Sequence, residues 1–241
     1  MAFQPLPDAV LRPLSDSSAF ATTAERLGAV IRLGVFGFGE QLPPERELAV
    51  RLGVSRVNLR EAIAVLREAG MVRTRRGRGG GTTVLYAGHP AGPPDADELR
   101  ERGPQIRDAL DFRRVVEPGA AHLAASRQLD ADQRDWLTGC LAGYEEQADT
   151  AGAGPDHRIA DSRLHLAVAT LTGSPMLVEA VIRVQASLDS PLSRLPAGVE
   201  ECRQAHRGVV AAILAGDPLA ARAEMERLCD RTAGQLRALL A

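Results

Sequence analysis

Three arginines in the first half of the sequence have the spacing needed to contact a nucleic acid from one side of a helix. Arg56, Arg60 and Arg67 fall within about 40° of one another on a helical wheel, so they would form a basic ridge. A guanidinium group can make forked contacts with a phosphate or with the N7 and O6 atoms of guanine. Ordinary solvated helix faces also carry arginines, so the ridge has to be judged together with the elements around it.

A second set of chemically capable residues lies in the other half. Asp161 and His165 stand four residues apart beside an apolar stripe, so on a helix they could point into a pocket together. His206 is in line with the apolar positions of a later stretch. An Asp–His pair at this spacing is also common on surfaces, and a core histidine need only satisfy its hydrogen bonds. Spacing alone leaves both interpretations open.

The remaining candidates of this half carry weaker signals. Arg113 precedes Glu117 by four residues, a spacing typical of a surface ion pair. His122 and His157 have no spacing that recommends them. Cys140, Cys202 and Cys229 lack the C-x-x-C pattern and predict neither a disulfide framework nor a zinc knuckle.

Composition restricts what these residues can belong to. The chain has 241 residues, enough for two domains, and its 45% hydrophobic residues are dominated by Ala and Leu, which favours helices. Between residues 21 and 86, eleven Arg stand against six Glu and no Asp, so a basic module is attached to an acidic remainder. No stretch is long and apolar enough for a membrane span, and the N-terminus lacks a signal-peptide pattern. We therefore expect a cytoplasmic protein without a membrane partner.

The elements that must position the basic ridge follow from periodicity and capping. After an N-terminal extension at residues 1–20, helices are predicted over 22–33 and 44–52. A third begins at the N-cap Ser55 and ends at Gly70. Its buried stripe would consist of Leu59, Ala62, Ile63 and Leu66. Two helices joined by a tight turn, the second of them basic, predict a helix-turn-helix whose second helix enters the major groove.

The stretch RTRRGRGGGTTV at residues 73–84 predicts a hairpin next to that helix. Strands are expected over 71–76 and 82–86, with Val72 and Thr74 turned inward and Arg73 and Arg75 outward. The stretch lacks the G-K-[ST] ending of a nucleotide-binding loop. Its run of three glycines is longer than a hairpin turn requires, and the whole unit is typical of a wing.

The second half of the chain is predicted to be helical throughout. Residues 87–104 are rich in Pro, Gly and acidic side chains and indicate a linker. From residue 105 to 241 only helical periodicity is present, in about six helices. Breaks are expected at Glu117–Pro118 and near residues 150–155, 173–175, 191–198 and 216–218.

The first module resembles the winged-helix DNA-binding domain of the GntR family of bacterial transcription regulators. The resemblance is carried by LPPERELAVRLGVSRVNLREAIAVLREAGMV and the Gly-rich wing that follows. It implies that arginines of the helix-turn-helix contact phosphates and bases in the major groove, with two polar residues assisting, and that the wing reaches the minor groove. The corresponding residues here are Arg46, Arg56 and Arg60, then Ser55 and Asn58, then Arg76 and Gly77.

The second module resembles the all-helical FCD domain of the FadR-type GntR branch. The matching stretches are FRRVVEPGAAHLAA, DSRLHLAVATLTGSPML and AHRGVVAAILAGDPLAARAEM. The resemblance implies a divalent metal, Zn²⁺ or a similar ion, held by Asp161, His165 and His206. It also implies that Arg113 faces a small carboxylate effector, which a guanidinium can hold by a forked pair of hydrogen bonds.

The fourth ligand position of that branch is occupied here by Leu228. Three ligands hold an ion less tightly than four, with water or an effector carboxylate completing the coordination. Cys229 is about 100° farther around the helix, so it could replace the missing histidine only after a shift of register.

Together these observations predict a mainly α protein with two domains. An N-terminal winged helix-turn-helix with a small two-stranded wing (residues 21–86) is followed by an all-α helical bundle for effector binding and dimerisation (105–241). We expect a homodimer that binds double-stranded DNA at a palindromic operator and acts as a repressor released by a small organic acid. Two alternatives are a metal-dependent hydrolase with a DNA-targeting domain and an architectural DNA binder that senses nothing. The hydrolase would need a general base or an H-E-x-x-H motif, which the sequence lacks. The architectural binder would be favoured by a wholly apolar C-terminal core.

Overall fold

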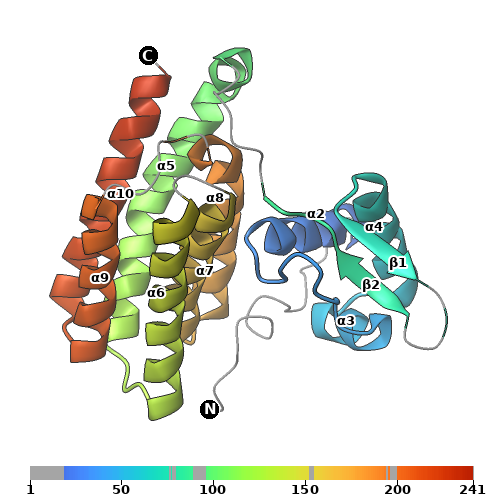
Figure 1. The fold of residues 1–241 in the computed structure, drawn as a ribbon, viewed down its shortest axis with the longest axis horizontal. Helices are drawn as coiled ribbons and strands as arrows, with labels where there is room; N and C mark the ends of the chain where they lie inside the picture. The colour runs from blue at the N-terminus through green and yellow to red at the C-terminus, as the bar shows by residue number, and fades with distance from the viewer. Residues whose placement is uncertain are drawn as a thin grey trace. The chain divides into compact units, whose positions relative to one another are not determined.

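The computed structural model describes residues 19–75, 77, 80–88, 96–151, 155–193, 195 and 200–240 (Figure 1). The chain divides into two compact units, whose described residues are 19–87 and 88–240. The predicted extension at 1–20 lies outside the described residues except for its last two positions, which begin a helix. Within the part of the chain that the structure describes, no helix has the length and apolar character of a membrane span.

The first unit contains three helices and a two-stranded sheet. These are α2 (Ala19–Arg32), α3 (Glu45–Leu52), α4 (Arg56–Glu68), β1 (Val72–Arg75) and β2 (Gly81–Val84). α4 packs against α2, α3 and β1, and the apolar face of α2 supplies the fully buried Leu27, Val30 and Ile31. This is the predicted winged helix-turn-helix.

The turn between α3 and α4 has the predicted chemistry. Gly53 ends α3 in the left-handed conformation, with φ 66°, which a residue with a Cβ adopts only with strain. Ser55 then caps α4, because its Oγ accepts a hydrogen bond from the Asn58 backbone N–H at 3.1 Å. The stripe predicted for the inner face of α4 is buried at all four positions, Leu59, Ala62, Ile63 and Leu66.

The wing is an antiparallel hairpin with Val72 opposite Val84 and Arg75 opposite Gly81. Val72 is buried while Arg73 and Arg75 are exposed, which confirms the predicted alternation. At the hairpin tip, a Cβ at Gly80 would lie 2.4 Å from the Arg75 carbonyl oxygen, so no larger residue fits there. The sequence suggested that the run of three glycines is longer than the turn requires, but the close backbone approach requires a glycine at position 80.

The second unit is a bundle of six described helices, as predicted. They are α5 (Ala96–Ala125), α6 (Ala131–Ala151), α7 (Pro155–Leu171), α8 (Pro175–Leu192), α9 (Glu200–Ala215) and α10 (Pro218–Leu239). α5 contacts α7, α8, α9 and α10, and α6 lies along α7 and α9 (Figure 1). Any buried side chain of α5 can therefore meet residues from several other helices.

Two boundaries in this unit differ from the prediction. α5 begins at Ala96, within the predicted linker at 87–104, because Leu99 is buried in a core cluster with residues of α8 and α10. The predicted break at Glu117–Pro118 is wrong, since α5 continues to Ala125. Pro118 removes one helical hydrogen bond at a cost of about 3 kcal/mol, and the buried residues around it, including Ala120 and Ala121, offset that loss.

The chain instead leaves the helix at residues 126–130. Asp130 and Gln133 exchange hydrogen bonds there: the Gln133 backbone N–H donates to Asp130 Oδ1 at 2.9 Å, and the Asp130 backbone N–H donates to Gln133 Oε1 at 3.0 Å. This is a capping box that starts α6. The D-x-x-Q spacing was the available sequence signal for this boundary.

Candidate functional site

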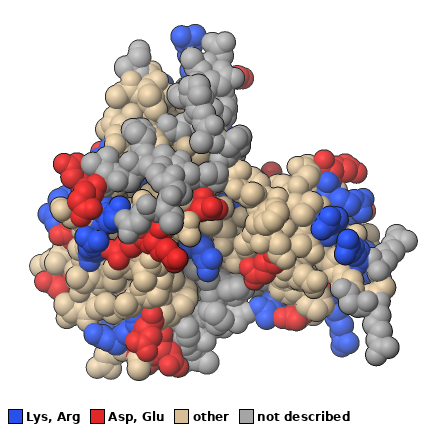
Figure 2. Space-filling view, in the orientation of Figure 1, with Lys and Arg blue, Asp and Glu red and all other residues tan. Residues whose placement is uncertain are grey.

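A groove of about 830 Å³ lies between α4 and the wing of the first unit. Four residues predicted to contact DNA line it, Arg46, Arg56, Arg60 and Gly77, together with Arg67 and Arg75. Figure 2 shows basic side chains gathered on the side of this unit that carries α4 and β1. The groove is therefore concave and rich in guanidinium groups, which suits a polyanion.

The other predicted DNA-contact residues are placed differently. Ser55 and Asn58 lie in the first turn of α4 and are linked by the N-cap hydrogen bond. Arg76 lies outside the described residues. The DNA contacts of all seven residues stay predictions.

Sequence reasoning missed one contact in the groove. Arg60 Nε donates to Glu45 Oε2 at 2.7 Å, across the turn from α3 to α4. Glu45 lies in the first turn of α3, 15 positions before Arg60, so no helical spacing pairs the two residues. The pair is exposed, with 60% of the Arg60 side chain and 32% of the Glu45 side chain accessible, so the guanidinium can exchange partners.

In the second unit the structure brings Asp161, His165 and His206 together. One donor atom from each lies within 4.8 Å of the others. His206 Nε2 is 3.1 Å from Asp161 Oδ1, and His165 Nε2 is 3.9 Å from the same oxygen. Both histidines are buried, on α9 and α7 respectively. Two imidazole nitrogens thus converge on one carboxylate oxygen.

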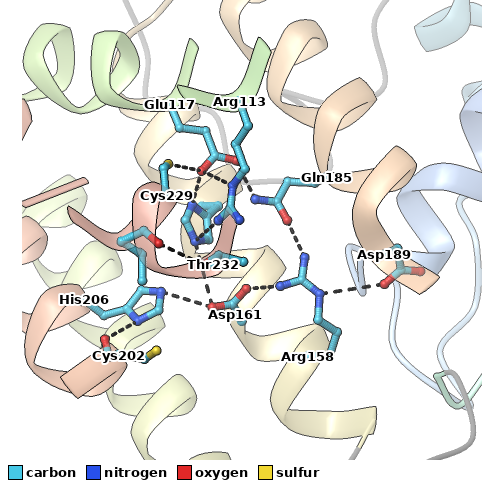
Figure 3. Close-up of polar contacts among 12 residues, drawn as sticks. Arg113, Glu117, Arg158, Asp161, Gln185, Asp189, Cys202, His206, Cys229 and Thr232 are labelled. Carbon is cyan, nitrogen blue, oxygen red and sulfur yellow. Dashed lines mark hydrogen bonds and ion pairs between the residues drawn. The ribbon is translucent and has the colours of Figure 1, made fainter. Parts of the chain in front are cut away.

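The second nitrogen of each ring lies close to an oxygen atom. His206 Nδ1 lies 2.8 Å from the Cys202 carbonyl oxygen (Figure 3). His165 Nδ1 lies 2.9 Å from Glu117 Oε2. These neighbours favour the proton on Nδ1, so the Nε2 lone pairs face Asp161. His206 Nε2 is buried without a hydrogen-bond partner, because its approach to Asp161 is not aligned for one. The donor set therefore fits a divalent metal ion.

The carboxylate of this cluster is held in its anionic form. Burial alone would raise the pKa of Asp161, but the positive charge of Arg158 outweighs it and holds that pKa well below its usual range. Arg158 Nη1 contacts Asp161 Oδ2, the oxygen turned away from the histidines. A ligating carboxylate is commonly supported in this way by a hydrogen bond to its other oxygen.

α10 contributes no fourth donor to this cluster among the described residues. Leu228 is buried and has no ligand atom. The Cys229 thiol lies 3.7 Å from Glu117 Oε2, outside the group formed by Asp161, His165 and His206. Burial raises the pKa of this thiol, which disfavours the thiolate that a metal requires. The geometry gives no support to Cys229 as a replacement ligand.

Arg113 and Glu117 form the expected pair, but the expectation of a surface pair is wrong. Arg113 Nε donates to Glu117 Oε2 at 2.9 Å, and each side chain is only 2% exposed. Burial opposes both charges, yet the Arg113 charge, helped by the neighbouring His165 ring, lowers the pKa of Glu117, and the Glu117 charge raises the pKa of Arg113. α5 is covered by four other helices, so the face of α5 that carries Arg113 and Glu117 lies inside the bundle.

Sequence reasoning missed a chain of contacts that extends this pair through Gln185 and Arg158 to Asp161 and Asp189. Gln185 on α8 donates from Nε2 to Glu117 Oε1 at 2.6 Å and accepts from Arg158 Nη2 at 2.5 Å (Figure 3). Arg158 contacts Asp161 and lies 3.9 Å from Asp189 Oδ1. Gln185 is 68 positions from Glu117, and no local spacing could have paired them.

The histidines without recommending spacing also have definite places. His157 lies one turn before Asp161, its ring 4.9 Å from that of Tyr144, which in turn is 4.3 Å from the His206 ring. Burial lowers the pKa of His157. His122 Nδ1 lies 3.2 Å from the Pro218 carbonyl and joins α5 to the start of α10. Tyr144 and His157 thus form an aromatic wall beside the cluster.

Comparisons with known proteins match both units. Residues 20–84 match the family described as bacterial regulatory proteins, gntR family, and residues 108–231 match the FCD domain. The chain is 31% identical over 227 residues to the Uxu operon transcriptional regulator of Escherichia coli K12, covering 85% of this chain and 84% of that protein.

Two further matches differ in what they can support. The chain is 35% identical over 188 residues to RmpR of Mycobacterium gastri, named as an HTH-type transcriptional regulator; the match spans 75% of this chain and 65% of that protein. The solved structure of E. coli McbR/YncC aligns with a TM-score of 0.53 at 18% identity, over 94% of this chain and all of that one. The last similarity concerns the fold.

Proposed function

Given that this chain belongs to the GntR family of transcriptional regulators and carries an FCD domain, we propose that it is a homodimer that binds a palindromic operator and releases it when a small organic acid occupies the helical unit. The observation that carries the sensing part is the convergence of Asp161, His165 and His206 beside the buried Arg113. A polar cluster of this kind is not the wholly apolar core expected of an architectural DNA binder. The relatives are named as transcriptional regulators, which sets aside the metal-dependent hydrolase.

For DNA binding, the support is the basic groove and the capped helix beside it. Arg46, Arg56 and Arg60 would contact phosphates and guanine edges, with Ser55 and Asn58 assisting at the helix N-terminus. Gly77 and Arg76 would bring the wing to the minor groove. Two recognition helices related by dimer symmetry read two half-sites, which is why a palindromic operator is expected.

The DNA-binding proposal is tested with an operator selected from random duplexes by the full-length protein. Replacing both Arg56 and Arg60 by Ala should weaken binding by about 2–6 kcal/mol, since each well-placed arginine contributes about 1–3 kcal/mol. The matched control is the double replacement of Arg222 and Arg227, two exposed arginines of α10. Fluorescence anisotropy measures binding, and sedimentation measures the oligomer. Undiminished binding of the Arg56/Arg60 variant would contradict the proposal.

For effector binding, the residues that would hold a divalent ion are Asp161, His165 and His206. The bound ion would supply a Lewis-acidic centre that a carboxylate oxygen can coordinate. Arg113 would hold the same carboxylate by hydrogen bonds, and the surrounding burial would exclude water from both contacts. Tyr144 and His157 would limit the size of the acid on one side.

The metal part is tested on chelator-treated full-length protein titrated with Co²⁺, whose visible absorption reports the ligand set. Asp161→Asn should weaken binding by roughly 10- to 100-fold or more, because losing only a supporting group of a metal site already costs that much. Asp156→Asn makes the same change at an exposed position on α7 and should leave affinity unchanged. Wild-type protein that takes up no Co²⁺ would refute the metal assignment while leaving DNA binding intact.

Regulation would follow from a population shift of the dimer. If the acid binds one arrangement better, it changes the spacing of the two recognition helices and thereby the affinity for the operator. One relative of this chain, 32% identical over 160 residues, is named as the Glc operon transcriptional activator of E. coli K12. The family thus includes a protein named as an activator, and the sign of regulation needs its own test. We propose repression, which predicts that the acid raises expression from the selected operator.

A further inference from the structure

The guanidinium of Arg113 is divided among three different surroundings. Its Nε donates to Glu117 Oε2 at 2.9 Å, and its Nη2 lies 3.3 Å from His165 Nε2. Its Nη1 is buried and has no hydrogen-bond partner. One nitrogen therefore anchors the side chain, one contacts an imidazole, and one is an unused donor in the interior.

The contact with His165 depends on the lone pair of that ring. Arginine has donors but no acceptor, so Nη2 can approach His165 Nε2 favourably only if Nε2 is unprotonated. The same tautomer is favoured at the other nitrogen, where Glu117 Oε2 lies 2.9 Å from Nδ1. The guanidinium at Nε2 and the carboxylate near Nδ1 thus both favour the tautomer with its lone pair on Nε2.

That lone pair is the one His165 would give to a metal ion with Asp161 and His206. One lone pair cannot serve a guanidinium N–H and a metal ion at once. We propose that Arg113 and the metal compete for His165 Nε2, so that metal loading releases Arg113 Nη2. Nη2 and the unused Nη1 then form a two-donor edge for the effector carboxylate, while Nε stays on Glu117. The inference rests on the effector function proposed above and adds an order: metal first, acid second.

The charges of the cluster favour the same order. Arg113 pairs with Glu117 and Arg158 pairs with Asp161, so both guanidinium charges are already balanced by carboxylates. The metal-free cluster therefore offers an incoming anion little net attraction in a buried site. A divalent ion would add two positive charges beside Arg113, so the loaded cluster attracts a carboxylate.

The decisive experiment uses wild-type protein and acetate as the probe carboxylate. Zn²⁺ affinity is measured with and without acetate, and acetate affinity with and without Zn²⁺, by calorimetry. We expect each ligand to tighten the other by the same factor, roughly 5- to 150-fold. Acetate binding that is equally tight without the metal would overturn the gating while leaving the proposed effector function in place. Absence of Zn²⁺ binding would overturn both.

A variant tests the competition itself. Arg113→Lys keeps a positive charge beside Glu117 but removes the Nη2 donor, so Zn²⁺ affinity measured without acetate should rise by about 2- to 10-fold. The acetate effect should be lost at the same time. Arg163→Lys, at an exposed arginine on α7, is the matched control, and circular dichroism monitors folding. Weaker Zn²⁺ binding by folded Arg113→Lys protein would show that Arg113 supports the metal instead of competing with it.

Discussion

The two units use the same ion pair in opposite surroundings. Arg60 contacts Glu45 at 2.7 Å with 60% of its side chain exposed, whereas Arg113 contacts Glu117 at 2.9 Å with 2% exposed. Nearly equal distances therefore describe different energetics. An exposed pair contributes about 0–1 kcal/mol and can give way to a phosphate, while breaking a buried pair costs about 3–5 kcal/mol. The first unit keeps the guanidinium of Arg60 exchangeable, and the helical unit keeps that of Arg113 fixed.

The largest effect expected from this comparison is on folding stability. Glu117→Gln should lower the free energy of unfolding by about 3–5 kcal/mol at pH 7, because the new amide would leave buried donors of Arg113, His165 or Gln185 without an acceptor. Glu45→Gln makes the same change in the exposed pair and should cost about 0.5 kcal/mol or less. Urea denaturation of both variants measures the contrast. Equal losses would refute the distinction between the two pairs.

The same comparison predicts a pH dependence. Burial would raise the pKa of Glu117, but Arg113 and His165 hold it below the ordinary value of 4.5. A carboxyl group whose pKa is lowered by folding stabilises the protein above its unfolded pKa, and this contribution is lost as the pH falls toward the folded value. The stability gap between wild type and Glu117→Gln should therefore narrow below about pH 4.5. A gap that stays constant from pH 7 to pH 4 would argue against this contribution.

A smaller effect is expected at Leu228, where the helical unit offers no fourth ligand to the cluster of Asp161, His165 and His206. Leu228→His would add an imidazole at the position that carries no ligand atom, and it should tighten Co²⁺ binding about tenfold, or about 1.4 kcal/mol. Leu228→Met, which keeps an apolar side chain of similar size, serves as the control. Unchanged affinity and an unchanged Co²⁺ spectrum in Leu228→His would mean that this position does not face the ion.

The smallest effect is expected at the edge of the exposed ridge. Arg67 lines the groove between α4 and the wing, at the end of α4. Its replacement by Ala should reduce the magnitude of the slope of log affinity against log salt concentration by about 0.9 for each protomer that loses a phosphate contact. Stability should change by no more than about 0.5 kcal/mol. Affinities measured across a salt series, with Arg227→Ala as the control, provide the test. An unchanged slope would remove Arg67 from the proposed interface.

The two units were also unequally predictable from the sequence. In the first, the contacts that define α4 are local: Ser55 caps its own helix, and the stripe from Leu59 to Leu66 repeats with the helical period. In the second, spacing paired Arg113 with Glu117 but could not tell that their side of α5 is buried, because burial depends on four other helices. Gln185 carried no local signal, and the i, i+3 spacing of Arg158 and Asp161 was the one local signal for Arg158. Pro118 was assigned a helix break because local propensity was considered without tertiary packing.

Glu117 gives the helical unit a particular evolutionary constraint. Its two carboxylate oxygens are contacted by four side chains: Arg113 from α5, His165 from α7, Gln185 from α8 and the Cys229 thiol from α10. Loss of Gln185 leaves Oε1 without a donor, and loss of Glu117 leaves several buried donors without an acceptor, so these contacts depend on one another. Descendants of this protein should therefore exchange these five residues as a set or keep them all. A lineage that evolves a response to a new acid would more readily change the aromatic wall formed by Tyr144 and His157.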